Sequence, residues 1–150
     1  MSSYTNILLT VDFSQTSDRV IERAETLATH NSCPLSLIHV VDYIPLTGTE
    51  FGEMVPFSYD ASDELLKASR ERLTRLGETL SIPESRQYLE VGGVRSEVIR
   101  VAKAMNADLI VIGSHGWKGL ELLLGSTADA ILHHAPCDVF VVRALPVETA

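Results

Sequence analysis

The sequence predicts a doubly wound α/β domain, in which a five-stranded parallel sheet carries helices on both faces. Short apolar runs alternate with segments of helical apolar spacing, and those runs are apolar at successive positions rather than at every second one. Strands of this kind are buried on both faces, which calls for a parallel sheet between two layers of helices. Because crossovers between parallel strands are right-handed, the expected topology is doubly wound and Rossmann-like.

The first half of the chain contains two predicted strands, at residues 7–11 and 35–41. The helix between them is expected to be capped by Ser14 or Ser17 and to bury a stripe made of Val20, Ile21, Ala24, Leu27 and Ala28. Prolines and glycines predict a loop over residues 42–60, which also carries several aromatic side chains. Three roles stay open for this loop: covering a ligand, contacting a second subunit, or packing on its own side chains.

The second half supplies two more helices, three more strands and a final short helix between the last two strands. The first helix has small and apolar residues at helical spacing and ends before Pro83; these are Leu65, Leu66, Ser69, Leu73, Leu76 and Leu80. A strand is predicted at 87–91, followed by a helix with an apolar face of Val94, Val98, Val101, Ala102 and Met105. The remaining elements are a strand at 109–112, a helix at 126–134 and a strand at 139–142.

Composition narrows the possible partners. The 150 residues fit one domain, 1–150, and the formal net charge of −8 disfavours nucleic acid and anionic membrane surfaces. The two cysteines form no CxxC pair, and no Cys/His spacing suits a metal held by the protein alone. No apolar stretch is long enough for membrane insertion, and the expected location is the cytoplasm.

The histidines have simpler structural roles than metal binding. His39 lies inside an apolar strand and is predicted to be a buried imidazole with a hydrogen-bond partner. His133 and His134 are adjacent on a helix, so their side chains point about 100° apart and cannot share one metal ion. Their place near the helix C-terminus is explained by the helix dipole.

Glycines and hydroxyl residues follow the most uniformly apolar strand. The strand at 109–112 runs into Gly113 and Gly116, and Gly125 then precedes Ser126 and Thr127 at a predicted helix start, where Ser126 with Asp129 makes a capping-box pattern. Glycine lets the backbone approach a ligand closely, and a helix start offers free N–H groups to an anion. The same residues occur for purely structural reasons, so both readings stay open. Neither a Walker A loop nor GxGxxG is present, which argues against a P-loop NTPase or an NAD dehydrogenase.

The chain resembles the universal stress protein family along nearly its whole length. The resemblance is carried by residues 7–14, 36–41, 107–116, 122–128 and 135–143 taken together. It implies an adenine-nucleotide α-hydrolase-like fold and a single family domain. ATP-binding members carry the pattern G-x2-G-x9-G-[ST]; Gly113, Gly116 and Gly125 match its glycines, but eight residues rather than nine separate the last two.

The resemblance also implies where a nucleotide would lie. Thr10 and Val11 would line the adenine slot, Asp12 would lie near the ribose or a magnesium ion, and the backbone of Val40 would read the base edge. The ribose and phosphates would be wrapped by the residues of the glycine pattern, namely Gly113, Ser114, His115, Gly116, Gly125, Ser126 and Thr127. Asp12 has an alternative role as a turn or helix cap.

Three functions follow, in order of preference. The first is a stress-response or regulatory module that binds ATP, with Mg²⁺, and acts through an unidentified regulatory protein partner. The second is a dimeric interaction module of the same family that binds no nucleotide. In both, the family implies a homodimer paired through Val139, Phe140, Val141 and Val142. The third is a slow ATP-hydrolysing or phosphate-transferring enzyme, for which the chain offers no recognisable acid–base pair and no nucleophile with an activating neighbour.

Overall fold

The predicted alternation of strands and helices is confirmed. The computed structural model describes residues 3–14, 16–42, 59–114 and 125–143. The strands are β1 (Ile7–Thr10), β2 (Leu35–Asp42), β3 (Gln87–Gly92), β4 (Leu109–Gly113) and β5 (Asp138–Val142). The helices are α1 (Ser17–Asn31), α2 (Tyr59–Leu80), α3 (Val94–Ala104) and α4 (Ser126–His134), with a short 3₁₀ turn η1 (Glu84–Arg86) that the sequence did not predict.

Within the described residues the five strands form one parallel sheet in the order β3-β2-β1-β4-β5. The chain therefore winds outward from β1 through β2 to β3, returns past β1, and continues outward through β4 to β5. The direction of winding reverses between β1 and β4, which pair in register from Ile7 opposite Leu109 to Leu9 opposite Val111. In open parallel sheets, ligands bind beyond the carboxyl ends of the strands at such a reversal.

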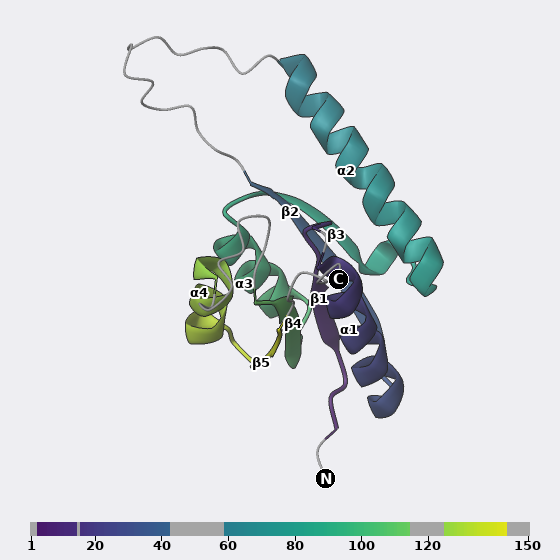
Figure 1. Cartoon of the computed structure of the whole chain (residues 1–150), viewed down its shortest axis with the longest axis vertical. Helices are drawn as coiled ribbons and strands as arrows, with labels where there is room; N and C mark the ends of the chain where they lie inside the picture. Colours follow the sequence, from purple (N-terminus) through teal and green to yellow (C-terminus); the bar gives the residue numbers. More distant parts are fainter. Residues whose placement is uncertain (1–2, 15, 43–58, 115–124, 144–150) are drawn as a thin grey trace, which may run out of the picture.

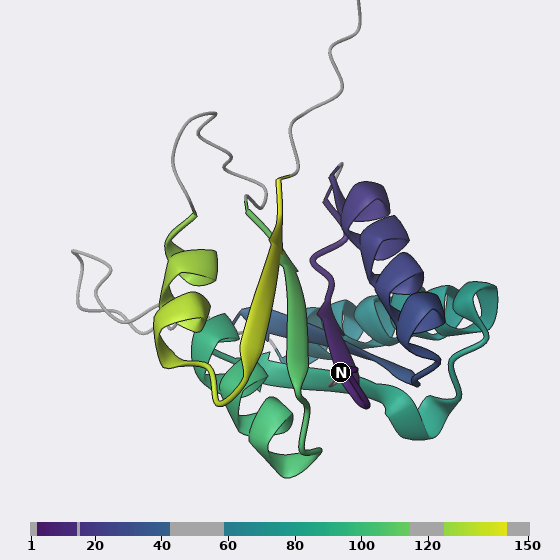
Figure 2. The same cartoon turned by 90° about the horizontal axis from the view of Figure 1, so that it is seen from below.

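Helices cover both faces of the sheet, with α1 and α2 on one side and α3 and α4 on the other (Figures 1 and 2). Alternate residues of one strand face opposite cores: Leu9 belongs to the core under α1 and α2, and Leu8 to the core under α3 and α4. Both side chains are fully buried. The predicted burial on both faces is therefore confirmed for β1, β2 and β4, whereas the outer strands β3 and β5 are mostly half-buried or exposed. Successive residues of a strand point to opposite faces of the sheet.

The helix starts differ from the prediction. The residue that flanks the start of α1 is Thr16, which makes no side-chain capping bond, and Ser17 is the first helical residue. Gly125 takes the flanking position before α4, again without a side-chain capping bond, so Ser126 is also inside its helix. The predicted caps at Ser14, Ser17 and Ser126 are wrong, because a serine can cap only from the non-helical flanking position. In α2, Leu65 is 49% exposed although it lies on the predicted apolar spacing.

The predicted loop lies almost wholly outside the described residues, and β2 and α2 bound it at Asp42 and Tyr59. No helix in the described ranges is both long enough and apolar enough to cross a membrane.

Candidate functional site at the carboxyl edge of the sheet

The ends of β1 and β4 are where the predicted nucleotide-binding residues come together. Thr10 is the last residue of β1, Val11 and Asp12 follow it, and Gly113 is the last residue of β4. The β1–β2 pairing ends at Thr10 opposite Ile38, and the Val11 N–H then donates to the Ile38 carbonyl at 2.9 Å. The chain leaves the sheet at this point, so residues beyond Ile38 on β2 extend past the end of β1.

Val40 lies two residues beyond Ile38 on β2. It is 7% exposed and belongs to the core under α3 and α4. Backbone groups of residues two apart in a strand point to the same neighbour, so those of Val40 face the side on which β1 has already ended. The expected role of the Val40 backbone toward a ligand stays a prediction.

The turn after β1 is anchored by His39, whose predicted hydrogen-bond partner is present, although its side chain is half-buried rather than buried. The His39 Nδ1 lies 2.8 Å from the Val11 carbonyl oxygen. Because a carbonyl only accepts, Nδ1 carries the proton and donates it to this bond. Burial is the main cause that lowers the pKa of His39; Arg72 adds to it, while the Val11 bond and Asp12 oppose it. The imidazole is therefore held in its neutral form.

Two further side chains, which the sequence analysis did not identify, complete this anchor. The Phe13 and His39 ring centroids are 4.7 Å apart, and the Arg72 guanidinium carbon lies 5.8 Å from the centre of the Phe13 ring. Phe13 has a φ of 58°, a left-handed conformation that is uncommon for a bulky residue. Tertiary packing from β2 and α2 therefore stabilises a turn that local preference disfavours.

Asp12 has the turn-forming role that the sequence left open beside the ligand role. Its Oδ1 accepts hydrogen bonds from the Ser14 N–H and from the Ser17 hydroxyl, each at 2.9 Å. The carboxylate thus ties the turn after β1 to the first residue of α1.

Thr10 is the residue of this region with an unexplained polar group. Its Oγ1 is buried and has no hydrogen-bond partner in the described structure. Thr10 follows Leu8 by two positions, so its side chain faces the layer that contains α4. Buried hydroxyls are nearly always hydrogen-bonded in native proteins, and an orphan one is commonly satisfied by a water, an ion or a ligand.

The two glycine-containing segments meet through backbone hydrogen bonds. The Gly125 N–H donates to the Ser114 carbonyl at 2.8 Å, and the Ser114 N–H donates to the Val142 carbonyl, also at 2.8 Å. The first bond holds the start of α4 against the end of β4, so the predicted convergence of the segments is present at their described ends. Together the two bonds use the N–H groups of Gly125 and Ser114, so these two amides are not available as donors to an anion.

Among the described residues of the glycine pattern, the first turn of α4 provides further donors. Ser126 and Thr127 are the first two helical residues and are exposed. An α-helix leaves its first N–H groups without an intrahelical acceptor, and the positive end of its dipole lies there. Of the predicted site residues, His115 and Gly116 lie outside the described residues. Among the residues that the structure does describe, no group of three or more His, Cys, Asp or Glu side chains is arranged to hold a metal ion.

The strand predicted to pair two subunits lies at one edge of the sheet. β5 pairs with β4 on one side, and Phe140 projects from it with 41% of its surface exposed. Val139 and Val141 are half-buried and Val142 is buried. An exposed edge strand with an apolar side chain is the kind of surface that pairs with another chain.

Comparisons with known proteins agree with this architecture. The Universal stress protein family profile matches residues 3–143. Universal stress protein A homolog 1 of Coxiella burnetii is 41% identical over 140 residues, covering 93% of this chain and 96% of the relative. Universal stress protein UspA from Lactobacillus plantarum superposes with a TM-score of 0.76 at 25% identity, covering 95% of this chain and all of that one.

A further solved structure is that of a universal stress protein in complex with cAMP. It aligns with a TM-score of 0.61 at 19% identity and covers 96% of this chain and 100% of its own. The likeness shows a shared fold. Taken with the profile match over residues 3–143 and the Coxiella relative, these findings show that the chain belongs to the universal stress protein family.

Proposed function

We propose that this chain binds an adenine nucleotide, ATP with Mg²⁺, at the carboxyl edge of the sheet, and acts in the cytoplasm as a stress-response or regulatory module through a protein partner. The observation that carries the proposal is the buried Thr10 hydroxyl without a partner, at the point where the winding of the sheet reverses. A ligand placed there would supply the missing partner.

The neighbouring groups fit a nucleotide chemically. The first turn of α4, at Ser126 and Thr127, offers amides and hydroxyls to phosphate oxygens. Val11, next to Thr10, is proposed to line the adenine slot, and the backbone of Val40 to read the base edge; their side chains are buried in the two cores on opposite faces of the sheet. Asp12 is the carboxylate nearest in sequence to this set and is the proposed neighbour of the ribose or of the magnesium ion. A fold relative that was solved with cAMP supports the class of ligand.

The test is a calorimetric titration of the purified chain with ATP, with and without Mg²⁺. We expect saturable binding, and we expect the Gly116→Val variant to lose it while keeping the fold, because a β-branched side chain would occupy the phosphate space. Unchanged ATP binding by a folded Gly116→Val variant would show that the glycine pattern does not contact the phosphates. Absence of heat at millimolar ATP in the unaltered chain would contradict the proposal as a whole.

The exposed Phe140 on edge strand β5 favours a second candidate, a homodimeric interaction module that works without a nucleotide. Calorimetry distinguishes the two, because a dimer in sedimentation that gives no heat with ATP and Mg²⁺ at millimolar ligand favours the second.

A further inference from the structure

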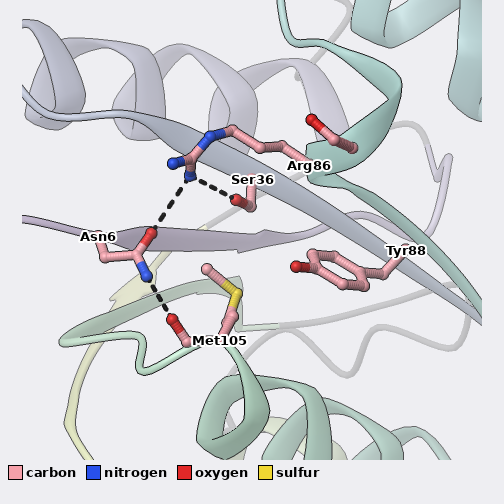
Figure 3. A pocket seen from close by; sticks show the side chains of 6 residues that line it. Asn6, Ser36, Arg86, Tyr88 and Met105 are labelled. Atoms are coloured by element: carbon pink, nitrogen blue, oxygen red, sulfur yellow. Dashed lines mark hydrogen bonds between the residues drawn. The ribbon is translucent and has the colours of Figure 1, made fainter.

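A hollow of about 310 Å³ lies at the amino-terminal edge of the sheet (Figure 3). It is lined by the residue before β1, by one residue each of β2 and β3, by the 3₁₀ turn and by the residue after α3, namely Asn6, Ser36, Tyr88, Ser85, Arg86 and Met105. Small-molecule sites have volumes of about 300–1,000 Å³, so the hollow suits a small ligand. It lies at the opposite edge from Thr10 and Gly113 and is separate from the proposed nucleotide site.

Arg86 supplies a positive charge that no acidic side chain among the described residues pairs with. Its Nη1 donates to the Asn6 Oδ1 at 3.4 Å and to the Ser36 hydroxyl at 3.2 Å, both of them neutral acceptors. Within the described ranges, Arg86 forms no ion pair, and its Nε and Nη2 donate to no acceptor. A guanidinium has five N–H donors, and most of those of Arg86 remain available to a ligand.

The neighbours of Arg86 are themselves held in place. The Asn6 Nδ2 donates to the Met105 carbonyl at 2.6 Å and also approaches the Asn106 carbonyl at 3.4 Å. These bonds orient the Asn6 amide so that its oxygen faces Arg86. Ser36 is 1% exposed, so its hydroxyl is fixed by burial in the sheet. A charge that is positioned before binding loses less conformational freedom when the ligand arrives.

The remaining walls are partly apolar. In Figure 3 the Tyr88 hydroxyl points toward the space between Asn6, Ser36 and Met105, and its ring forms one side of the hollow. Tyr88 and Met105 both pack against the core under α3 and α4. A tyrosine offers an apolar ring with one polar group, and a thioether makes favourable contacts with aromatic rings.

We propose that this hollow binds a small organic carboxylate, with its carboxylate on Arg86 and its apolar body against Tyr88 and Met105. A planar guanidinium matches the geometry of a carboxylate, whose two oxygens accept parallel hydrogen bonds. One unpaired cation balances one negative charge, whereas a multiply charged phosphate would meet the repulsion of a chain with net charge −8.

The probe that tests the proposal is benzoate, with benzamide as its neutral analogue and inorganic phosphate as a second anion. Binding is followed by amide NMR shifts of the purified full chain. We expect benzoate to shift the signals of Asn6, Ser36 and Tyr88 saturably, and benzamide and phosphate to leave them unchanged. The Arg86→Gln variant should weaken benzoate binding about tenfold or more, because it removes a charge-assisted hydrogen bond.

The matched control is Arg95→Gln, which makes the same charge change at an exposed position of α3 and should leave benzoate binding unaltered. Because Arg86 also ties Asn6 to Ser36, a Tyr88→Phe variant provides a second test that keeps the charge and should weaken binding more modestly. Benzoate binding equally well to folded Arg86→Gln, or causing no shifts at millimolar concentration, would overturn the proposal. Shifts caused by phosphate but not by benzoate would overturn the assignment to a carboxylate. ATP titration of the same variants tests the proposed nucleotide site at the carboxyl edge separately.

Discussion

At the amino-terminal edge of the sheet the Asp108 carboxylate adds a cluster of side-chain hydrogen bonds to backbone bonds such as that from the Asp108 N–H to the Asn6 carbonyl, whereas at the carboxyl-terminal edge backbone bonds join the ends of β4, β5 and α4. On the amino side, the Asp108 carboxylate accepts from the Thr5 N–H at 2.7 Å, the Thr5 hydroxyl at 2.8 Å and the Asn6 N–H at 3.0 Å. On the carboxyl side, the bonds of Val11, Ser114 and Gly125 join backbone to backbone. The His39 ring and the Asp12 carboxylate are the additions there.

This difference teaches how the two edges would hold a negative charge. The carboxyl edge offers backbone amides and a helix dipole, which demand close approach of the chain and therefore glycine. The amino edge offers one guanidinium positioned by neutral side chains. A side-chain hydrogen bond needs a particular residue at its position. At the carboxyl edge, the buried Thr10 hydroxyl has no hydrogen-bond partner among the described residues.

The largest expected effect is a loss of stability on replacing Asp108 at the amino edge. Replacing Asp108 with alanine should lower the free energy of unfolding by about 2–3 kcal/mol, because three donors lose a charged acceptor. Denaturant unfolding measures this, and Asp108→Asn, which keeps an acceptor oxygen, should lose less. ATP affinity at the distant edge should not change in either variant. A stability equal to that of the unaltered chain would contradict the structural role given to Asp108.

The Asp108 carboxylate also makes the free energy of unfolding depend on pH in the acid range. Burial alone would raise the pKa of Asp108, but the hydrogen bonds from Thr5 and Asn6 outweigh it, and the pKa lies below its ordinary value. The carboxylate therefore stabilises the fold fully above the unfolded-state pKa of about 3.9, and this contribution is lost as the pH falls further. Asp108→Asn should remove that part of the acid sensitivity.

The next expected effect concerns Thr10, whose replacement should change ATP affinity more than stability. Thr10→Val removes the unpartnered hydroxyl while keeping the shape, so it should leave the free energy of unfolding unchanged or raise it by up to about 1 kcal/mol. ATP affinity should fall by about tenfold, the loss of one hydrogen bond. Thr10→Ser is the matched control, because it keeps the hydroxyl and should retain affinity. If Thr10→Val bound ATP as tightly as the unaltered chain, the hydroxyl would have no role toward the ligand.

The smallest effect concerns the His39 anchor. With its folded-state pKa below the unfolded value of about 6.5, neutral His39 stabilises the fold fully above that pH and progressively less below it. The slope is a fraction of the about 1.4 kcal/mol per pH unit that one whole proton would give. His39→Asn can place an amide donor near the Val11 carbonyl without titrating. Thermal unfolding between about pH 7.5 and about pH 5.5 should show a shallower slope for the variant; an equal slope would assign the pH dependence to other groups.

Much of the fold was accessible from local patterns. The strands apolar at successive positions, such as 109–112, and the spacing of Val20, Ala24 and Ala28 follow from which face each residue must bury, and the structure has them in those elements. The exact first residue of a helix was harder to predict. Ser17 and Ser126 have the right chemistry for a cap, but Thr16 and Gly125 occupy the flanking positions. A shift of one residue costs little locally, so the tertiary packing of each helix decides it.

The candidate sites divide in the same way. The family resemblance implied that 113–114 and 125–127 would wrap one ligand; the Gly125–Ser114 bond brings their described ends together, and the binding role stays a prediction. The packing of Phe13 on His39, and the meeting of Arg86 with Asn6 and Ser36, join residues that are far apart in the chain. Sequence periodicity carries no signal for such contacts.

The sequence by itself determined the kind of each element, the two buried faces of the strands and the residues that carry the family's glycine pattern, because each of these depends on a residue and its near neighbours. The tertiary structure alone decided the order β3-β2-β1-β4-β5, the orphaned state of the Thr10 hydroxyl and the unpaired charge of Arg86 within the described residues. These depend on which distant segments become neighbours, and that is settled by packing the whole sheet between its helices.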